Sequence, residues 1–265
     1  MTVHVEEIEI VDNRTRLVGG VAIEPSPRWV RAYLGGVAVA DSRRVLLAFE
    51  PRRLPVYWFP VRDVRMDLLA PARQEGVPTA GIARWTLRVG ERTVANAAWS
   101  YPDPGPERAA LADHIAFYWK GMDAWYEEDD EVFVHPRDPY GRVDVLHNSR
   151  RVRVEMEGQV LAESTRPRLL FETGLPTRYY LPKQDVRMDL LEPTATTSRC
   201  PYKGVASYWA VRRGETLIPD LVWSYPLPIP ECPKIENLLC FFNEQVDIFV
   251  DDERQPRPVT EWSNR

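Results

Sequence analysis

The stretch Asp63-Val-Arg-Met-Asp-Leu-Leu69 recurs without a change as Asp185-Val-Arg-Met-Asp-Leu-Leu191. The two stretches lie 122 residues apart, and at this offset 20 of the 44 positions from 28 to 71 are identical. Further along the chain, at an offset of 124, Trp99-Ser-Tyr-Pro102 matches Trp223-Ser-Tyr-Pro226. Agreement over this length does not arise by chance. The sequence therefore predicts a tandem duplication of one unit of about 120 residues.

The duplication also predicts where the chain divides. Gly19 and Gly141 align and mark the start of each copy, so we expect one domain over residues 1–136, with an N-terminal strand and a linker, and a second over residues 137–265. The acidic run 127–131 and the Pro- and Gly-rich stretch 136–141 are typical of a solvated turn plus a connection. Residues 3–11 and 132–134 are candidate strands. We expect the two copies to be related by a pseudo-two-fold axis, which would make the chain a monomer with an internal pseudo-dimer.

Charge and composition exclude several classes of partner. The formal net charge is −5, so a generally basic nucleic-acid binder or anionic-membrane binder is not expected. No apolar run approaches the length of a membrane span, and the N-terminus lacks the features of a signal peptide. The cysteines number three, an odd count that favours reduced thiols over a disulfide framework. We therefore predict a cytoplasmic protein that binds neither nucleic acid nor membrane.

Hydrophobic residues alternate with a period of two, which is typical of strands. The pattern predicts a hairpin over 152–164, short strands at 169–172 and 179–182, and a second hairpin over 206–225. Pro219 within this second hairpin indicates an edge strand or a bulge. One short helix per copy is expected, at 235–243 and at 109–120. The predicted fold class is thus mainly β, with two homologous small β-roll or barrel-like domains that each carry one short helix.

A string of motifs in the second copy resembles a known family. The string is Gly158-x-Val-x-Ala-Glu-Ser164, Phe171-Glu172, Tyr179-Tyr-x-Pro182, Asp185-Val-Arg-Met-Asp-Leu-Leu191, Cys200-Pro-Tyr-Lys-Gly204 and Trp223-Ser-Tyr-Pro226. It is similar to the bacterial and fungal family DUF427, a domain of unknown function sometimes labelled nucleotidyltransferase-like. The first copy departs from the string at Thr79-Ala80-Gly81, where only the glycine is kept. The resemblance implies a compact β-rich fold and carries no established activity.

The repeated Asp-Val-Arg-Met-Asp segment is the first candidate for chemistry. If the segment is a strand, Asp185 and Asp189 point to the same face, and so do Asp63 and Asp67. Two carboxylates this close would suit acid–base work or a divalent cation. The alternative is structural: one aspartate caps a turn and the other pairs with the arginine between them.

Other candidates lie in the second copy. A thiol at Cys200 near Lys203 favours the thiolate, and a lysine in an apolar site is a cation or an amine nucleophile. The same five residues, 200–204, also make a good turn. Glu172 follows an apolar strand and is either half-buried or simply the first exposed residue. Ser164 has no histidine nearby and is interpreted as a turn-stabilising hydroxyl. The histidines and cysteines lack ligand spacing, so neither a metal nor a cofactor is predicted.

Three functions remain open at this point. The leading hypothesis is a pair of small-molecule-binding β domains with an aromatic and carboxylate-lined pocket. Because the first copy lacks the cysteine and the lysine, we expect the ligand in the second copy, at Tyr179, Tyr180, Asp185, Asp189, Tyr202, Lys203 and Trp223. The alternatives are an enzyme that uses acid–base or covalent chemistry, with candidate catalytic residues Glu172, Tyr180, Asp185, Cys200 and Lys203, and a nucleotidyltransferase.

Overall fold

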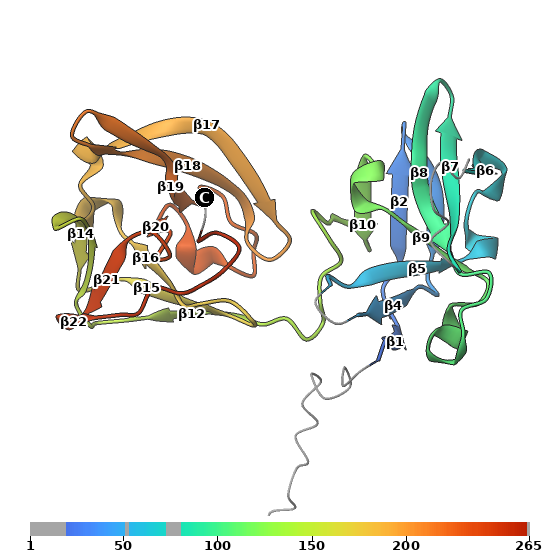
Figure 1. The fold of residues 1–265 in the computed structure, drawn as a ribbon, viewed down its shortest axis with the longest axis horizontal. Coiled ribbons are helices and arrows are strands. Elements are labelled where there is room, and N and C mark those ends of the chain that lie inside the picture. Colours follow the sequence, from blue (N-terminus) through green and yellow to red (C-terminus); the bar gives the residue numbers. More distant parts are fainter. Residues whose placement is uncertain (1–19, 51–52, 73–80, 264–265) are drawn as a thin grey trace, which may run out of the picture. The chain divides into compact units, whose positions relative to one another are not determined.

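A computed structural model describes residues 20–50, 53–72 and 81–263, and it contains two compact units (Figure 1). The first unit is Met1–Tyr140 and the second is Gly141–Arg265. Each unit is built from two antiparallel sheets, one of seven strands and one of four. The candidate strand at residues 3–11 lies outside the described residues.

The first unit places its seven-stranded sheet in the order β1-β4-β5-β9-β8-β7-β6 and its four-stranded sheet in the order β11-β10-β2-β3. Three-residue 3₁₀ helices η2 (Val61–Asp63) and η3 (Met66–Leu68) follow β5, and η4 (Pro106–Leu111) and η5 (Trp119–Gly121) flank β9. The strands are β1 (Ala22–Pro25), β2 (Val30–Leu34), β3 (Val37–Ser42), β4 (Leu46–Phe49), β5 (Val56–Pro60), β6 (Leu69–Pro71), β7 (Ala83–Val89), β8 (Arg92–Ser100), β9 (His114–Phe117), β10 (Ala124–Glu127) and β11 (Asp130–Glu131).

The second unit repeats this plan strand for strand. Its sheets run β12-β15-β16-β20-β19-β18-β17 and β14-β13-β21-β22. The 3₁₀ helices are η6 (Lys183–Asp185), η7 (Met188–Leu190) and η8 (Pro233–Ile235). The strands are β12 (Val143–His147), β13 (Val152–Met156), β14 (Gln159–Ser164), β15 (Arg168–Glu172), β16 (Arg178–Leu181), β17 (Leu191–Cys200), β18 (Gly204–Arg213), β19 (Thr216–Ser224), β20 (Leu239–Phe241), β21 (Asp247–Val250) and β22 (Glu253–Arg254). The mainly β class and the duplication are confirmed, and within the described residues the end strands of the seven-stranded sheets do not pair to close a barrel.

The hairpin predicted over 152–164 is β13–β14, and its turn chemistry explains it. Glu157 and Gly158 both have positive φ, at 49° and 83°, as a two-residue turn that matches the strand twist requires. Along β13 the buried residues Val152, Val154 and Met156 alternate with half-buried ones. One face of the hairpin therefore packs in the core, as its period of two predicts.

The bulge predicted at Pro219 is present, although β19 is an inner strand of its sheet. The register with β18 shifts between Trp209 and Val211, and Asp220 has a positive φ of 54°. The same shift occurs in the first unit, where Asn96 has a φ of 52°. Since Ala95 stands there in place of the proline, the bulge belongs to the fold and does not need proline.

Two predictions about local structure are wrong. The segments expected as helices, 235–243 and 109–120, hold the strands β20 and β9, with 3₁₀ turns beside them. Both strands are short buried apolar runs inside a sheet, and periodicity alone cannot tell such a run from a helix. Residues 132–134 are not a strand. The acidic run 127–131, in contrast, forms the exposed hairpin turn between β10 and β11, as expected of a solvated turn.

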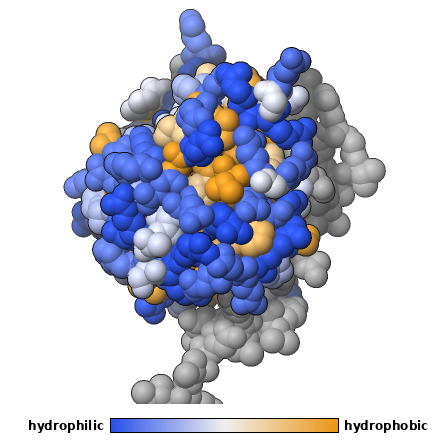
Figure 2. All heavy atoms as spheres, turned by 90° about the vertical axis from the view of Figure 1, so that its left-hand side faces the viewer, coloured by the Kyte–Doolittle hydropathy of each residue, from blue (hydrophilic) through white to orange (hydrophobic). Residues whose placement is uncertain are grey.

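The seven-stranded sheet of the first unit is apolar on both faces. Tyr57 and Phe59 of β5 pack on the four-stranded sheet, whereas Trp58 points to the other face, where it forms a separate cluster with Ala48, Leu111 and Ala116. In the second unit the corresponding residues all belong to one continuous core. Outside that core, the face of the second unit seen in Figure 2 is mostly hydrophilic, with one group of apolar side chains near its middle.

We expect Gly204→Ala to destabilise the second unit more than Gly214→Ala does. Both glycines have positive φ, at 103° and 59°, so alanine is strained at either position. Only at Gly204 would the added Cβ also meet backbone, 3.2 Å from the Leu227 oxygen and 3.4 Å from the Ile229 nitrogen. Urea unfolding should show a loss of about 2–3 kcal/mol for Gly204→Ala and about 1 kcal/mol for Gly214→Ala. Equal losses of stability would contradict the close approach of Gly204 to the backbone of residues 227–229.

Candidate functional site

The Asp-Val-Arg-Met-Asp segment is not a strand but two 3₁₀ turns, η6 and η7, joined at Val186. Asp185 accepts hydrogen bonds from Ser164 Oγ at 2.7 Å and from Arg166 Nε at 3.2 Å. The Arg166 hydrogen bond, with that of Ser164, lowers the pKa of Asp185 against the opposing effect of burial. Asp189 is exposed and accepts two hydrogen bonds from Arg187, at 2.8 and 2.6 Å.

The first unit repeats these contacts. Asp63 accepts from Ser42 Oγ and from Arg44, both at 2.6 Å, and Arg65 donates twice to Asp67. The two aspartates of each segment thus have separate partners, and neither pair lines one wall. The same network in both copies indicates that it holds the turns after β5 and β16.

The structure brings Glu172, Cys200 and Lys203 together in the second unit. Lys203 is 8% exposed, and its Nζ lies 2.5 Å from Glu172 Oε2. Burial alone would lower the pKa of Lys203, but the charges and hydrogen bonds of Cys200 and Glu172 outweigh it and raise that pKa. Lys203 is therefore held as an ammonium ion, which favours an ion-pair role over a nucleophilic one.

Buried thiol and phenol groups surround this ion pair. Cys232 is 2% exposed, and burial raises the pKa of its thiol to about 11, while the Lys203 charge acts in the opposite direction. Burial also raises the pKa of Tyr225 well above its ordinary value, and the electrostatic effect of Cys200 raises it further. These groups stay protonated at neutral pH and belong to the packed interior.

The remaining residues predicted to bind a ligand are spread through the second unit. Tyr180 is fully buried, and its hydroxyl accepts a hydrogen bond from Trp223 Nε1 at 3.0 Å. Tyr202 is half-buried in the turn after β17, and Tyr179 lines a small cavity of about 180 Å³ near Asn243. Tyr180 and Trp223 share the core with Cys200, whereas Asp185 and Asp189 contact other partners.

The first unit contains a larger cavity, of about 440 Å³, lined by residues from both faces of its seven-stranded sheet. Aliphatic and charged residues line it together with eight aromatic side chains. The aromatic residues are Tyr57, Trp58, Trp99, Tyr101, Phe117, Tyr118, Trp119 and Trp125. Trp58 stacks on Tyr101, with 5.1 Å between ring centroids, and Trp99 lies 4.4 Å from Tyr118.

Charged groups also lie at this cavity. Glu50 accepts hydrogen bonds from Arg53 at 2.8 Å and from Arg108 at 3.1 Å. Arg84 donates to the Tyr118 hydroxyl at 3.0 Å. Glu50 corresponds to Glu172 of the second unit, so the same carboxylate is neutralised in both copies by cations from different loops.

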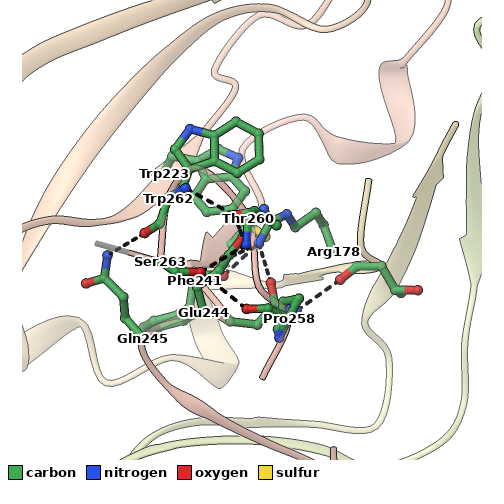
Figure 3. Close-up of polar contacts among 12 residues, drawn as sticks. Arg178, Trp223, Phe241, Glu244, Gln245, Pro258, Thr260, Trp262 and Ser263 are labelled. Atoms are coloured by element: carbon green, nitrogen blue, oxygen red, sulfur yellow. Dashed lines mark hydrogen bonds and ion pairs between the residues drawn. The ribbon is translucent and has the colours of Figure 1, made fainter. Parts of the chain in front are cut away.

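The aromatic wall itself is present in both units. Trp58 meets Trp99 edge to face at 5.6 Å, and their counterparts Tyr180 and Trp223 do so at 6.3 Å. The two units differ in the side chain next to these aromatic rings, because Val56 of β5 corresponds to Arg178 of β16. Arg178 is 6% exposed, and its guanidinium forms two hydrogen bonds of 2.7 Å with the buried Glu244. Figure 3 shows this pair beside the C-terminal residues Thr260 and Trp262.

The ligand site expected in the second copy stays a prediction, and the larger cavity described above lies in the first unit, at positions that the two copies do not share. The signal that could have located it is the pair of replacements Val56 for Arg178 and Arg108 for Cys232.

Two structural tests complete the site description. Among the described residues, no three His, Cys, Asp or Glu side chains are placed to hold a metal ion. In the same part of the chain, no helix is long and apolar enough to cross a membrane.

We expect Lys203→Met to lower the free energy of unfolding of the second unit by about 3–5 kcal/mol, because it leaves the Glu172 carboxylate buried and unpaired. Adding Glu172→Gln to that variant should recover part of the loss, since the unpaired charge is then gone. Chemical denaturation of the wild type, both single variants and the double variant measures the coupling. Additive losses would show that the two groups do not interact.

The comparisons with known proteins agree with this description. The family described as domain of unknown function DUF427 matches the chain twice, over residues 22–128 and 144–252. No curated protein matches the chain. Each matched range covers both sheets of one unit. The chain belongs to the DUF427 family and carries the domain twice.

Proposed function

We propose that this protein binds a small, largely apolar molecule in the cavity of its first unit. The observation that carries the proposal is the aromatic wall around about 440 Å³ of space. Binding sites for small molecules are concave and mostly apolar, with volumes of about 300–1,000 Å³ and a few polar groups that fix orientation. Glu50, Arg53 and Arg84 supply such groups at the cavity.

Binding is favoured over catalysis by the state of the candidate reactive groups. Lys203 is paired with Glu172, and the raised pKa values of Lys203 and Cys232 keep both groups protonated at neutral pH. Both groups would have to lose a proton to act as nucleophiles.

Nucleotidyl transfer receives less support because the repeated aspartates already have hydrogen-bond partners. Its metal ions need carboxylate oxygens that converge on one point. Asp185 and Asp189 instead accept hydrogen bonds from different arginines, Arg166 and Arg187. A divalent cation would have to displace these bonds.

The first unit is favoured because the residues at one position differ between the two copies. Val56 leaves open the space that Arg178 and its partner Glu244 fill in the second unit. The proposed site thus keeps the aromatic and carboxylate character expected from the sequence but lies in the other copy.

Titration of the full chain with uncharged probes tests the proposal. Indole and cyclohexylmethanol should each be added while amide resonances are recorded by NMR, and we expect shifts in β5, β8 and β9. Trp99→Ala should weaken binding at least about tenfold, because this half-buried ring forms part of the wall.

Trp209→Ala is the matched control, since Trp209 is a half-buried tryptophan of the second unit. It should leave the affinity unchanged. The proposal is wrong if neither probe binds at millimolar concentration, or if Trp209→Ala reduces binding as much as Trp99→Ala.

A further inference from the structure

We infer that the ligand of the first-unit cavity is a planar aromatic ring that carries a carboxylate group. This inference rests on the proposed function and specifies the class of molecule. It is drawn from the second unit, where the chain supplies its own occupant at the corresponding place, and from the charges at the first-unit cavity.

The internal occupant is the indole of Trp262. Its ring lies 6.4 Å from the Phe242 ring, between centroids. The Arg178 guanidinium carbon is 5.4 Å from the indole, and Figure 3 labels both Arg178 and Trp262. Its position is fixed by hydrogen bonds, because its backbone N–H donates to Thr260 Oγ1 at 3.1 Å and its carbonyl accepts from Gln245 at 3.3 Å. The flat bicyclic indole thus packs on the outer face of the seven-stranded sheet of the second unit.

The residues around Trp262 have counterparts that line the first-unit cavity. Phe242 corresponds to Tyr118 and Arg178 to Val56, and both Tyr118 and Val56 are part of the cavity wall. Two side chains that contact the indole in the second unit therefore have counterparts at the wall of a cavity in the first. Aromatic walls favour a planar ring, through stacked or edge-to-face contacts.

The charges at the cavity select the substituent on that ring. Arg53 and Arg108 pair with Glu50, at 2.8 and 3.1 Å, so these charges neutralise one another. Arg84 is half-buried, and within the described part of the chain its guanidinium contacts the Tyr118 hydroxyl and no carboxylate. A guanidinium presents paired N–H donors that match the two oxygens of a carboxylate. An anionic group on the ring would complete this arrangement, whereas an ammonium group would be repelled.

Three probes with one ring system separate the effect of charge from that of shape. They are 3-(indol-3-yl)propionate, its uncharged amide and 3-(indol-3-yl)propylamine, each titrated calorimetrically into the full chain. We expect the carboxylate to bind at least about tenfold more tightly than the amide, and the amine to bind most weakly. Arg84→Gln should reduce the preference for the carboxylate over the amide to less than about threefold.

Arg88→Gln is the matched control, because Arg88 is an exposed arginine of the same strand, β7. It should keep the full preference. Equal affinity of the carboxylate and the amide for the wild type would overturn the anionic class while leaving the proposed cavity in place. If cyclohexylmethanol binds the cavity and no indole compound does, the planar class is wrong. If no probe binds at all, the proposed function fails as well.

Discussion

Everything in this fold depends on covering a β-sheet that is apolar on both faces. The four-stranded sheet covers one face of each seven-stranded sheet. The other face presents Trp58 and Trp99 in the first unit and Tyr180 and Trp223 in the second. Large aromatic surface left in water is unfavourable by roughly 25 cal/mol per Å². Each copy must therefore put something over this face, and the two copies use different coverings.

The second unit covers it with its own chain and with a buried ion pair. The side chains of Arg178 and Glu244 are 7% and 0% exposed, and Thr260 Oγ1 donates to Glu244 at 2.7 Å. Burial raises the pKa of Glu244, but the hydrogen bonds of Arg178 and Thr260 lower it more. Replacing a buried ion pair with apolar side chains is often neutral or even stabilising, so such a pair is weak evidence for added stability. We interpret it as the contact that fixes the C-terminal segment in place over the aromatic face. The first unit has Val56 at the corresponding position and keeps a cavity there.

Much of the fold was predictable from the sequence because local patterns determine it. The seven-residue repeat revealed the duplication, and the alternation around Gly158 predicted the hairpin β13–β14. The helix expected over 235–243 is mostly turn and strand because an apolar run of five residues, 238–242, fits either structure until its neighbours in the sheet are known. The sequence offers the two aspartates of the repeated segment as a close pair, yet Asp185 pairs with Arg166, 19 residues away, and Asp189 with Arg187, two residues away.

The candidate site was harder to predict because it is a cavity. A cavity depends on which side chains leave space unfilled, and no residue type marks it. Glu172, Cys200 and Lys203 do meet, as their chemistry suggested, and the raised pKa of Lys203 favours an ion pair. The cavity of the first unit arises where a valine replaces an arginine, and no motif marks such a change. Which copy is open and which is filled follows only from the packing of segments far apart in sequence, such as Trp262 against Phe242.

The most direct test is a crystal structure of the full chain soaked with 3-(indol-3-yl)propionate. The account predicts density for the ring against Trp99 and Tyr118 of the first unit, with Trp262 still packed near Phe242 in the second. Density in the second unit in place of Trp262, with the first-unit cavity empty, would contradict it.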